Sequence, residues 1–141
     1  MKYTVRILTL VAMMTPLFAS AQLTSSQHLA ANVPFQFRVG NTLIPAGKCV
    51  VQRAGLNPWT LVILNSSAGA SLFSNSSINH VKQASQNNAM VFHKYGERYF
   101  LAGIKLEGSN TVYQLPEGHA EAELRAQNVP VREETLLALL Q

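Results

Sequence analysis

Apolar residues recur at every second position in several short runs of this chain, and this alternation limits its fold more than any other feature. In the first run, Val33, Phe35 and Phe37 share one side, while Gln36 and Arg38 share the other. A side-chain period of two is typical of strands that bury one face. The pattern therefore predicts a chain that is mainly β structure.

Turn signals rich in Gly, Asn and Pro separate these runs and set the number of strands. The best hairpin signal is Gly96-Glu97, which stands between two alternating runs. The runs are 33–39, 42–45, 48–53, 59–64, 70–74, 89–95, 98–106 and 111–115. The polar residues 75–88 predict a surface loop. Seven to eight short strands in this order predict a single antiparallel β-sandwich or small barrel.

The pattern changes once, after Leu115. Residues 116–126 predict one C-terminal α-helix, because Pro116 suits a first helical position and Glu121 suits the first turns. Glu121 and Arg125 have the spacing of an i,i+4 ion pair. Residues 131–140 would suit a terminal helix or a closing strand. We predict the strand, because it fits a β body better.

The N-terminal segment has the three parts of a cleavable secretory signal. Lys2 and Arg6 are followed by an apolar run at 7–18 and by small residues at 19–21. The apolar run is too short for a membrane span, which needs roughly 20 residues. We therefore predict a signal peptide at 1–21 and a mature chain, without a transmembrane segment, that is exported to the periplasm or the extracellular space. An N-terminal core helix is the alternative.

Within the mature chain, residues 22–32 predict a flexible lead-in and residues 33–141 a single β-rich domain. Removal of the signal leaves nine basic residues against seven acidic ones. No basic run remains that could neutralise a row of phosphates, so we predict no nucleic-acid partner. Cys49 is the single cysteine, and the alternation of its strand points it inward. A buried thiol is therefore expected, with an intermolecular disulfide as the alternative.

The composition argues against several classes of enzyme. All seven acidic residues are Glu, and five of them follow Leu115, which leaves Glu97 and Glu107 as solvated turn residues. Glycosidases need two carboxyl groups that flank a cleft, and calcium loops need clustered acidic residues. Gly69-Ala70-Ser71 is only a fragment of a nucleophile elbow. We therefore predict no catalytic residue, although the sequence does not decide whether the protein is an enzyme.

The histidines do not form a recognisable metal motif. His28, His80, His93 and His119 are not at ligand spacing with one another, and no cysteine cluster accompanies them. We therefore predict no metal site and no cofactor. A site assembled in three dimensions from His28, His80 and His93 is the remaining alternative.

One hairpin combines aromatic and basic side chains. The candidate binding surface consists of His93, Tyr95, Arg98 and Tyr99, whose rings and guanidinium could stack on a sugar or a peptide. The alternative is that the aromatic residues pair across the strands and fix the register of the hairpin.

Four segments resemble a family of small exported bacterial proteins. Residues 33–37, 43–51 and 91–101 are similar to its VPF-x-F, LPAG-x-Y-x-V and FHRYG…YFL motifs. Residues 115–124 are similar to its LP-x-S-x-A-E-x-E-L segment. The resemblance implies an exported β domain and no particular activity.

The chain departs from the family motifs at three positions. Ile44 stands in place of Leu, Cys49 in place of an aromatic residue, and Gly118 in place of a small polar residue. The change at Cys49 favours a packing role for this side chain.

Together these features predict an exported, non-enzymatic β-domain protein that acts as a binding or envelope-associated module. Its expected partners are a carbohydrate, a peptide or another envelope protein. The alternatives are a small hydrolase, metal-dependent or not, and a small outer-membrane β-barrel, although most of these strands are shorter than the 9–11 residues that such a barrel needs.

Overall fold

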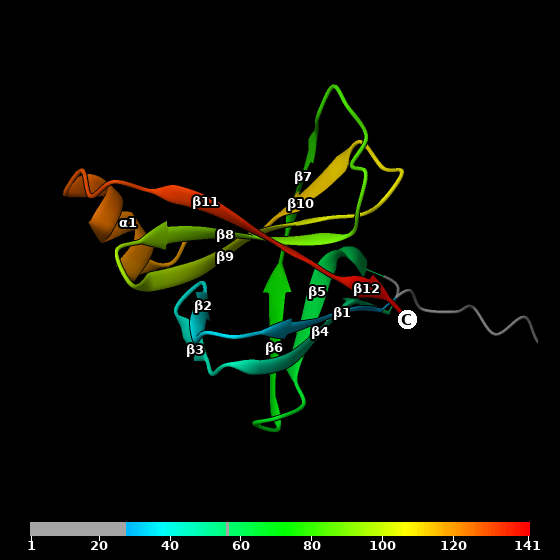
Figure 1. Ribbon diagram of the computed structural model, residues 1–141, viewed down its shortest axis with the longest axis horizontal. Coiled ribbons are helices and arrows are strands. Elements are labelled where there is room, and N and C mark those ends of the chain that lie inside the picture. Colours follow the sequence, from blue (N-terminus) through cyan, green and yellow to red (C-terminus); the bar gives the residue numbers. More distant parts are fainter. Residues whose placement is uncertain (1–27, 56) are drawn as a thin grey trace, which may run out of the picture.

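The computed structural model describes residues 28–55 and 57–141, which form two β-sheets and one α-helix (Figure 1). The predicted signal peptide and residues 22–27 lie outside the described residues. The mainly β fold with one late helix is confirmed, and the two facing sheets correspond to the sandwich alternative. Twelve strands occur among the described residues, more than the seven or eight predicted.

Sheet A is antiparallel and contains the first and the last strand of the fold. Its order is β12 (Leu139–Leu140), β1 (Leu29–Val33), β4 (Gly47–Ala54), β5 (Asn57–Asn65) and β6 (Ala70–Asn75). β1 pairs with β12 on one side and with β4 on the other. The two ends of the described chain therefore meet in one sheet.

Sheet B carries the predicted hairpin at its centre. Its order is β11 (Arg132–Leu137), β8 (Ala89–Tyr95), β9 (Arg98–Lys105), β10 (Thr111–Gln114) and β7 (Ser77–His80). Two short strands, β2 (Phe37–Val39) and β3 (Thr42–Ile44), join it through a parallel pairing of β2 with β9. The hairpin turn between β8 and β9 is confirmed, and Gly96 adopts the positive φ of 60° that the turn requires.

The described chain passes from one sheet to the other at four places. Residues 34–36 join β1 to β2, residues 45–46 join β3 to β4, Ser76 joins β6 to β7, and Ala138 joins β11 to β12. Figure 1 shows the last of these crossings, where β11 leaves sheet B and continues as β12 beside β1. Such corners let one run of sequence serve both sheets of a sandwich.

The core lies between the facing sides of the two sheets. Sheet A contributes apolar residues from β1, β4 and β5, and sheet B contributes Met90, Phe92, Leu101 and Ile104. Cys49 is 0 % exposed in this core, which confirms its predicted inward direction.

Three predicted boundaries were wrong. Strand β1 begins at Leu29, so part of the predicted flexible lead-in is a strand with buried residues. The run 33–39 is two strands, because the chain changes sheet at residues 34–36 and Pro34 has no N–H for a ladder. The predicted loop 75–88 contains β7, whose polar side chains gave no alternation to detect.

The C-terminal elements were predicted more closely. Helix α1 (His119–Ala126) begins three residues later than expected, and Gly118 is its N-cap. The segment after it is extended, as predicted, and forms β11 and β12. In the part of the chain that the structure describes, no helix has the length and apolar character of a membrane span.

Candidate functional site

A cleft of about 540 Å³ lies on the outer face of sheet B, on the side opposite the core. Helix α1 and the segment before it form one wall, and strands β7 to β11 supply the floor and the other walls. The lining residues that carry the argument are Val91, His93, Tyr95, Glu117, Glu121 and Arg125. The cleft is therefore built from segments that are far apart in the sequence.

A β-bulge explains why the sheet is hollow at this point. The register of β8 with β9 shifts so that Val91 faces Gly103 while Phe92 faces Leu101, which leaves Ala102 as the extra residue. The N–H of Leu115 donates to the carbonyl oxygen of Ala102 at 2.9 Å. Ala102 and Gly103 both line the cleft, so the floor carries little side-chain volume there.

Helix α1 is positioned by a contact with the turn between β2 and β3. Gly118 has no side chain to cap the helix, and the side-chain oxygen of Asn41 accepts from the N–H of His119 at 2.8 Å instead. A Cβ atom at Gly118 would lie against the backbone carbonyl of Gly40. The glycine therefore allows the helix to approach the turn closely.

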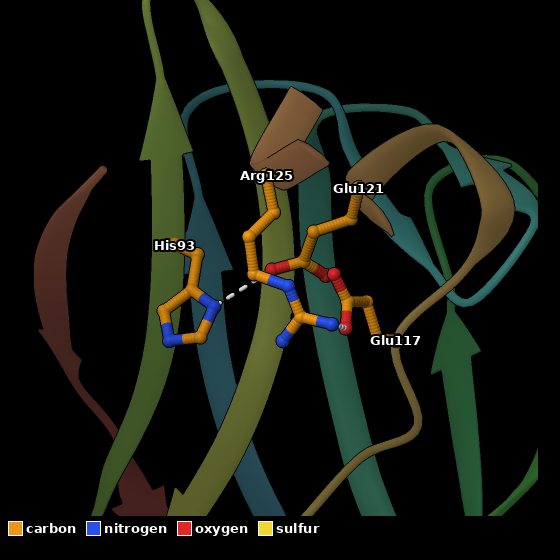
Figure 2. Close-up of polar contacts among 4 residues, drawn as sticks. All are labelled: His93, Glu117, Glu121 and Arg125. Carbon is orange, nitrogen blue, oxygen red and sulfur yellow. Dashed lines mark hydrogen bonds and ion pairs between the residues drawn. The ribbon is translucent and has the colours of Figure 1, made fainter. Parts of the chain in front are cut away.

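The approach of the helix brings Glu121 to His93 (Figure 2). His93 points from β8 toward the helix, and its Nδ1 lies 2.7 Å from Oε1 of Glu121. An ionised carboxylate only accepts, so the Nδ1–H of His93 donates. The residue Glu121 is 6 % exposed, whereas the side chain of His93 is 38 % exposed. The pair therefore fixes an imidazole at the cleft by means of a buried carboxylate.

The predicted ion pair between Glu121 and Arg125 was wrong. Arg125 Nη2 instead contacts Oε2 of Glu117 at 2.7 Å, as Figure 2 shows. Glu121 turns inward toward His93, while the Arg125 side chain remains 70 % exposed at the rim. Helical spacing made the predicted pair possible, but a partner on the sheet took its place.

Three further side chains line the cleft: the buried Tyr95 and the charged pair of Lys105 and Glu133. Burial raises the pKa of Tyr95, and the carboxylates of Glu121 and Glu117 raise it further. Tyr95 therefore stays protonated well into the alkaline range. On the other side of His93, Lys105 Nζ lies 3.7 Å from Oε1 of Glu133, a residue of β11.

The structure divides the four sequence candidates between two faces of the hairpin. His93 and Tyr95 alternate along β8 and both line the cleft. Residues directly opposite each other on paired strands share a face, and Tyr99 is opposite Lys94, which lies between His93 and Tyr95. The Tyr99 side chain is therefore on the other face of the hairpin. The Tyr99 ring stacks on Phe35 at a centroid distance of 3.7 Å.

Arg98 takes no part in the cleft. Its guanidinium lies 5.7 Å from the ring centre of Phe100, and with Tyr99 it borders a separate recess of about 130 Å³. The hairpin therefore does not present its four candidates as one surface.

Glu121 is the site residue that the sequence analysis missed. It was assigned to the helix N-terminus, and 28 positions separate it from His93. The only signal was its place in the segment that resembles the A-E-x-E-L motif. The periodicity of the sequence did not indicate that Glu121 is buried, because one buried carboxylate on a short helix does not change the apolar pattern.

Among residues 28–55 and 57–141, no three His, Cys, Asp or Glu side chains gather closely enough to hold a metal ion. His28, His80 and His93 are all in these ranges and do not form the three-histidine alternative.

Comparison of the chain with protein-family models, with curated proteins and with solved structures returned no match. The resemblance to exported bacterial proteins therefore stays a prediction.

Proposed function

We propose that the protein is an exported, non-enzymatic binding module, and that the cleft between sheet B and α1 is its ligand site. The observation that carries this proposal is the buried Glu121 carboxylate, held by His93 at the wall of a cleft of about 540 Å³. A buried carboxylate costs free energy unless it is compensated, so a fold that keeps one beside a cleft is consistent with recognition there.

The size and lining of the cleft support a small ligand. Sites for small molecules measure roughly 300–1,000 Å³ and combine apolar walls with a few converging polar groups. Here Val91, Ala102 and Val112 supply apolar surface, and His93 and Glu121 supply the polar groups. Of the expected partners, a small ligand or a short peptide segment fits this volume better than the face of a folded protein.

Export is the second part of the proposal. It is supported by the charged end, apolar run and small residues of segment 1–21. The resemblance to exported bacterial proteins supports the same destination.

The His93–Glu121 pair also favours a second candidate, a hydrolase. A carboxylate that binds one imidazole nitrogen leaves the other free to act as a general base. Ser77 lines the same cleft, but β7 is three strands away from β8, roughly 14 Å at about 4.8 Å per strand. Such an enzyme would therefore activate water at His93 rather than a serine.

A ligand screen tests the proposal. The protein is recovered from the periplasm of an expressing bacterium, where a chain that begins at Gln22 is expected. Carbohydrates, peptides and small molecules are screened by thermal shift, and hits are mapped by amide NMR. We expect hits to shift the amides of β8, β9 and α1. Ala102→Leu should abolish their binding by filling the floor, provided that its own melt shows a folded protein.

Phe73→Ala is the control variant, because Phe73 is exposed on sheet A. It should bind each hit as the wild type does. Hits that bind Ala102→Leu undiminished would overturn the proposed site, and a full-length chain found only in the cytoplasm would overturn export. Conversion of a hit to product, lost in His93→Gln, would replace the binding module by the second candidate.

A further inference from the structure

Two of the three carboxylates in the cleft form ion pairs with an arginine or a lysine, side chains that are positively charged at neutral pH. Glu117 contacts Arg125 at 2.7 Å, and Glu133 contacts Lys105 at 3.7 Å. Both pairs lie toward the solvent, and each balances one negative charge with one positive charge. The net charge of the cleft therefore depends on the third carboxylate.

Glu121 is the third carboxylate and the most buried of them, and its ion-pair partner is His93. An imidazole carries a positive charge only when it is protonated. With His93 neutral, the cleft has three negative charges and two positive ones. A hydrogen bond from a neutral donor stabilises the Glu121 carboxylate but does not cancel its charge.

The groups that face Glu121 from the neighbouring elements do not supply the missing charge. They are His93 and Tyr95 from β8, Arg125 from α1, Glu117 from the segment before α1, and more distantly Lys105 and Glu133. Tyr95 is neutral, and the cations of Arg125 and Lys105 are engaged by other carboxylates. The uncompensated charge therefore belongs to the cleft itself.

Next to this charge the cleft is lined by apolar residues, and the side chains of its floor are small. Val91, Val112 and Leu115 line it together with Ala102 and Gly103 at the bulge. Tyr95 also lines the cleft, and aromatic rings attract cations through their faces. A ligand with a cationic group at one end and a hydrocarbon body would satisfy the carboxylate and cover the floor.

We infer that the cleft binds organic cations, in which an ammonium group contacts Glu121 and an apolar body covers the bulged floor of sheet B. This inference rests on the proposed function and specifies its ligand class. The ammonium group and a protonated His93 would neutralise the same carboxylate, so protonation of His93 should compete with the ligand. A free amine and a lysine side chain share this chemistry.

Three small probes of similar shape test the inference. ¹⁵N-labelled exported protein is titrated with phenethylamine, with neutral phenethyl alcohol and with the anion phenylacetate. We expect phenethylamine to shift amides of β8 and α1 saturably and to bind at least about tenfold more tightly than the alcohol. Nα-acetyllysine methylamide is the fourth probe, and its affinity relative to phenethylamine distinguishes a lysine side chain from a free amine as the source.

Charge variants provide the controls. Glu121→Gln keeps the size and an acceptor for His93, and it should bring the amine and the alcohol to within about twofold of each other. Glu107→Gln removes a carboxylate outside the cleft and should keep the full preference. Persistence of the preference in Glu121→Gln would overturn the inference.

The histidine supplies an independent readout, which remains usable if Glu121→Gln does not fold. Because a protonated His93 and the ammonium group would neutralise the same carboxylate, phenethylamine should bind the wild type more weakly as the pH is lowered. His93→Gln keeps a hydrogen-bond donor that cannot take up a proton, and its amine affinity should not change with pH.

The outcomes separate this inference from the proposed function. Equal binding of the amine and the alcohol in the cleft would overturn the cation preference and leave the binding module standing. Absence of binding by all of the probes would contradict the inference, while hits of another class from the ligand screen would still support the cleft.

Discussion

The buried thiol of Cys49 shows how a single side chain couples the fold to pH. Its inner-face position leaves it without solvent contact, and burial raises its pKa from 9.0 to about 11. The cause is desolvation, because the apolar core offers the thiolate no substitute for the water that would solvate it. In the unfolded chain the same thiol is solvated and ionises at its ordinary pKa.

This difference predicts a loss of stability in alkali. The contribution of the neutral thiol is complete below pH 9 and is lost as the pH rises through about 11, because the unfolded state releases its proton first. Cys49→Ala should lower the free energy of unfolding at neutral pH by about 1–2 kcal/mol through the cavity it leaves. The same variant should show a shallower alkaline decline, as measured by urea unfolding across this range.

The comparison uses the slope with pH and not the absolute stability, so the cavity does not obscure it. Tyr95 also has a raised pKa and remains in the variant, which should therefore keep part of the decline. Equal slopes for wild type and Cys49→Ala would contradict a buried, neutral thiol.

Individual side-chain directions were predictable wherever one strand face was apolar. The inward direction of Cys49 follows from its position two residues before Val51 on β4, since residues i and i+2 of a strand share a face. The direction of Tyr99 did not follow, because the candidate surface combined it with Tyr95 although the hairpin register sets the two side chains on opposite faces. Glu121 was out of reach, since its direction depends on where α1 docks and not on its own neighbours.

At the scale of elements, α1 depends on a residue that lies 78 positions away. The helix has eight residues, a length that is marginal in isolation. Asn41 supplies the cap that Gly118 lacks, and Arg38 donates to the backbone carbonyl of Asn41 at 3.1 Å. The β2–β3 turn therefore holds the first turn of the helix, and with it Glu121.

Changing Asn41 tests this connection. Asn41→Ala removes the acceptor for the His119 N–H and should cost about 0.5–2 kcal/mol of unfolding free energy, the usual range for a lost cap. It should also speed amide hydrogen exchange in α1 more than in sheet A. Asn41→Asp keeps an acceptor and adds a charge that suits a helix N-terminus, so it should restore both values. An Asn41→Ala variant with unchanged exchange in α1 would show that the helix is held by other contacts.

The sequence predicted elements better than their boundaries. Periodicity identified the strands of both sheets where apolar residues alternate, and the polar β7 escaped it. The start of α1 was misplaced because Pro116 and Glu117 resemble a first helical turn, whereas the close approach of Gly118 to Gly40 fixes the start. Boundaries set by contacts distant in sequence carry no local signal.

At the scale of the whole molecule, the acidic residues are confined to one side of the sandwich. The strands of sheet A contain no Glu, and all seven carboxylates belong to residues 97–134. Their excess after Leu115 was visible in the sequence, but only the fold brings Glu117, Glu121 and Glu133 to one cleft. The uneven distribution of Glu along the chain thus gives the two sheets different contents of acidic residues.

The two sheets are connected by the pairing of the first strand with the last. β12 follows β11 after the single residue Ala138, and it pairs with β1 through Leu29 and Ala30. Beyond the strands, the N–H of Gln141 donates to the carbonyl oxygen of His28 at 2.8 Å, and the reverse bond measures 3.2 Å. The pairing therefore covers an edge of β1 and fixes the end of β11.

Removal of residues 139–141 tests what this pairing contributes. The truncated chain loses the backbone hydrogen bonds to β1, at about 0.5–1.5 kcal/mol for each bond. A loss of about 1–3 kcal/mol in the free energy of unfolding is therefore expected from urea unfolding, along with faster hydrogen exchange in β1. Leu139→Ser is the matched control, because its side chain is 72 % exposed and its backbone can still pair. It should stay within about 0.5 kcal/mol of the wild type. A control as unstable as the truncated chain would mean that the side chain of Leu139, and not the strand pairing, joins the two ends.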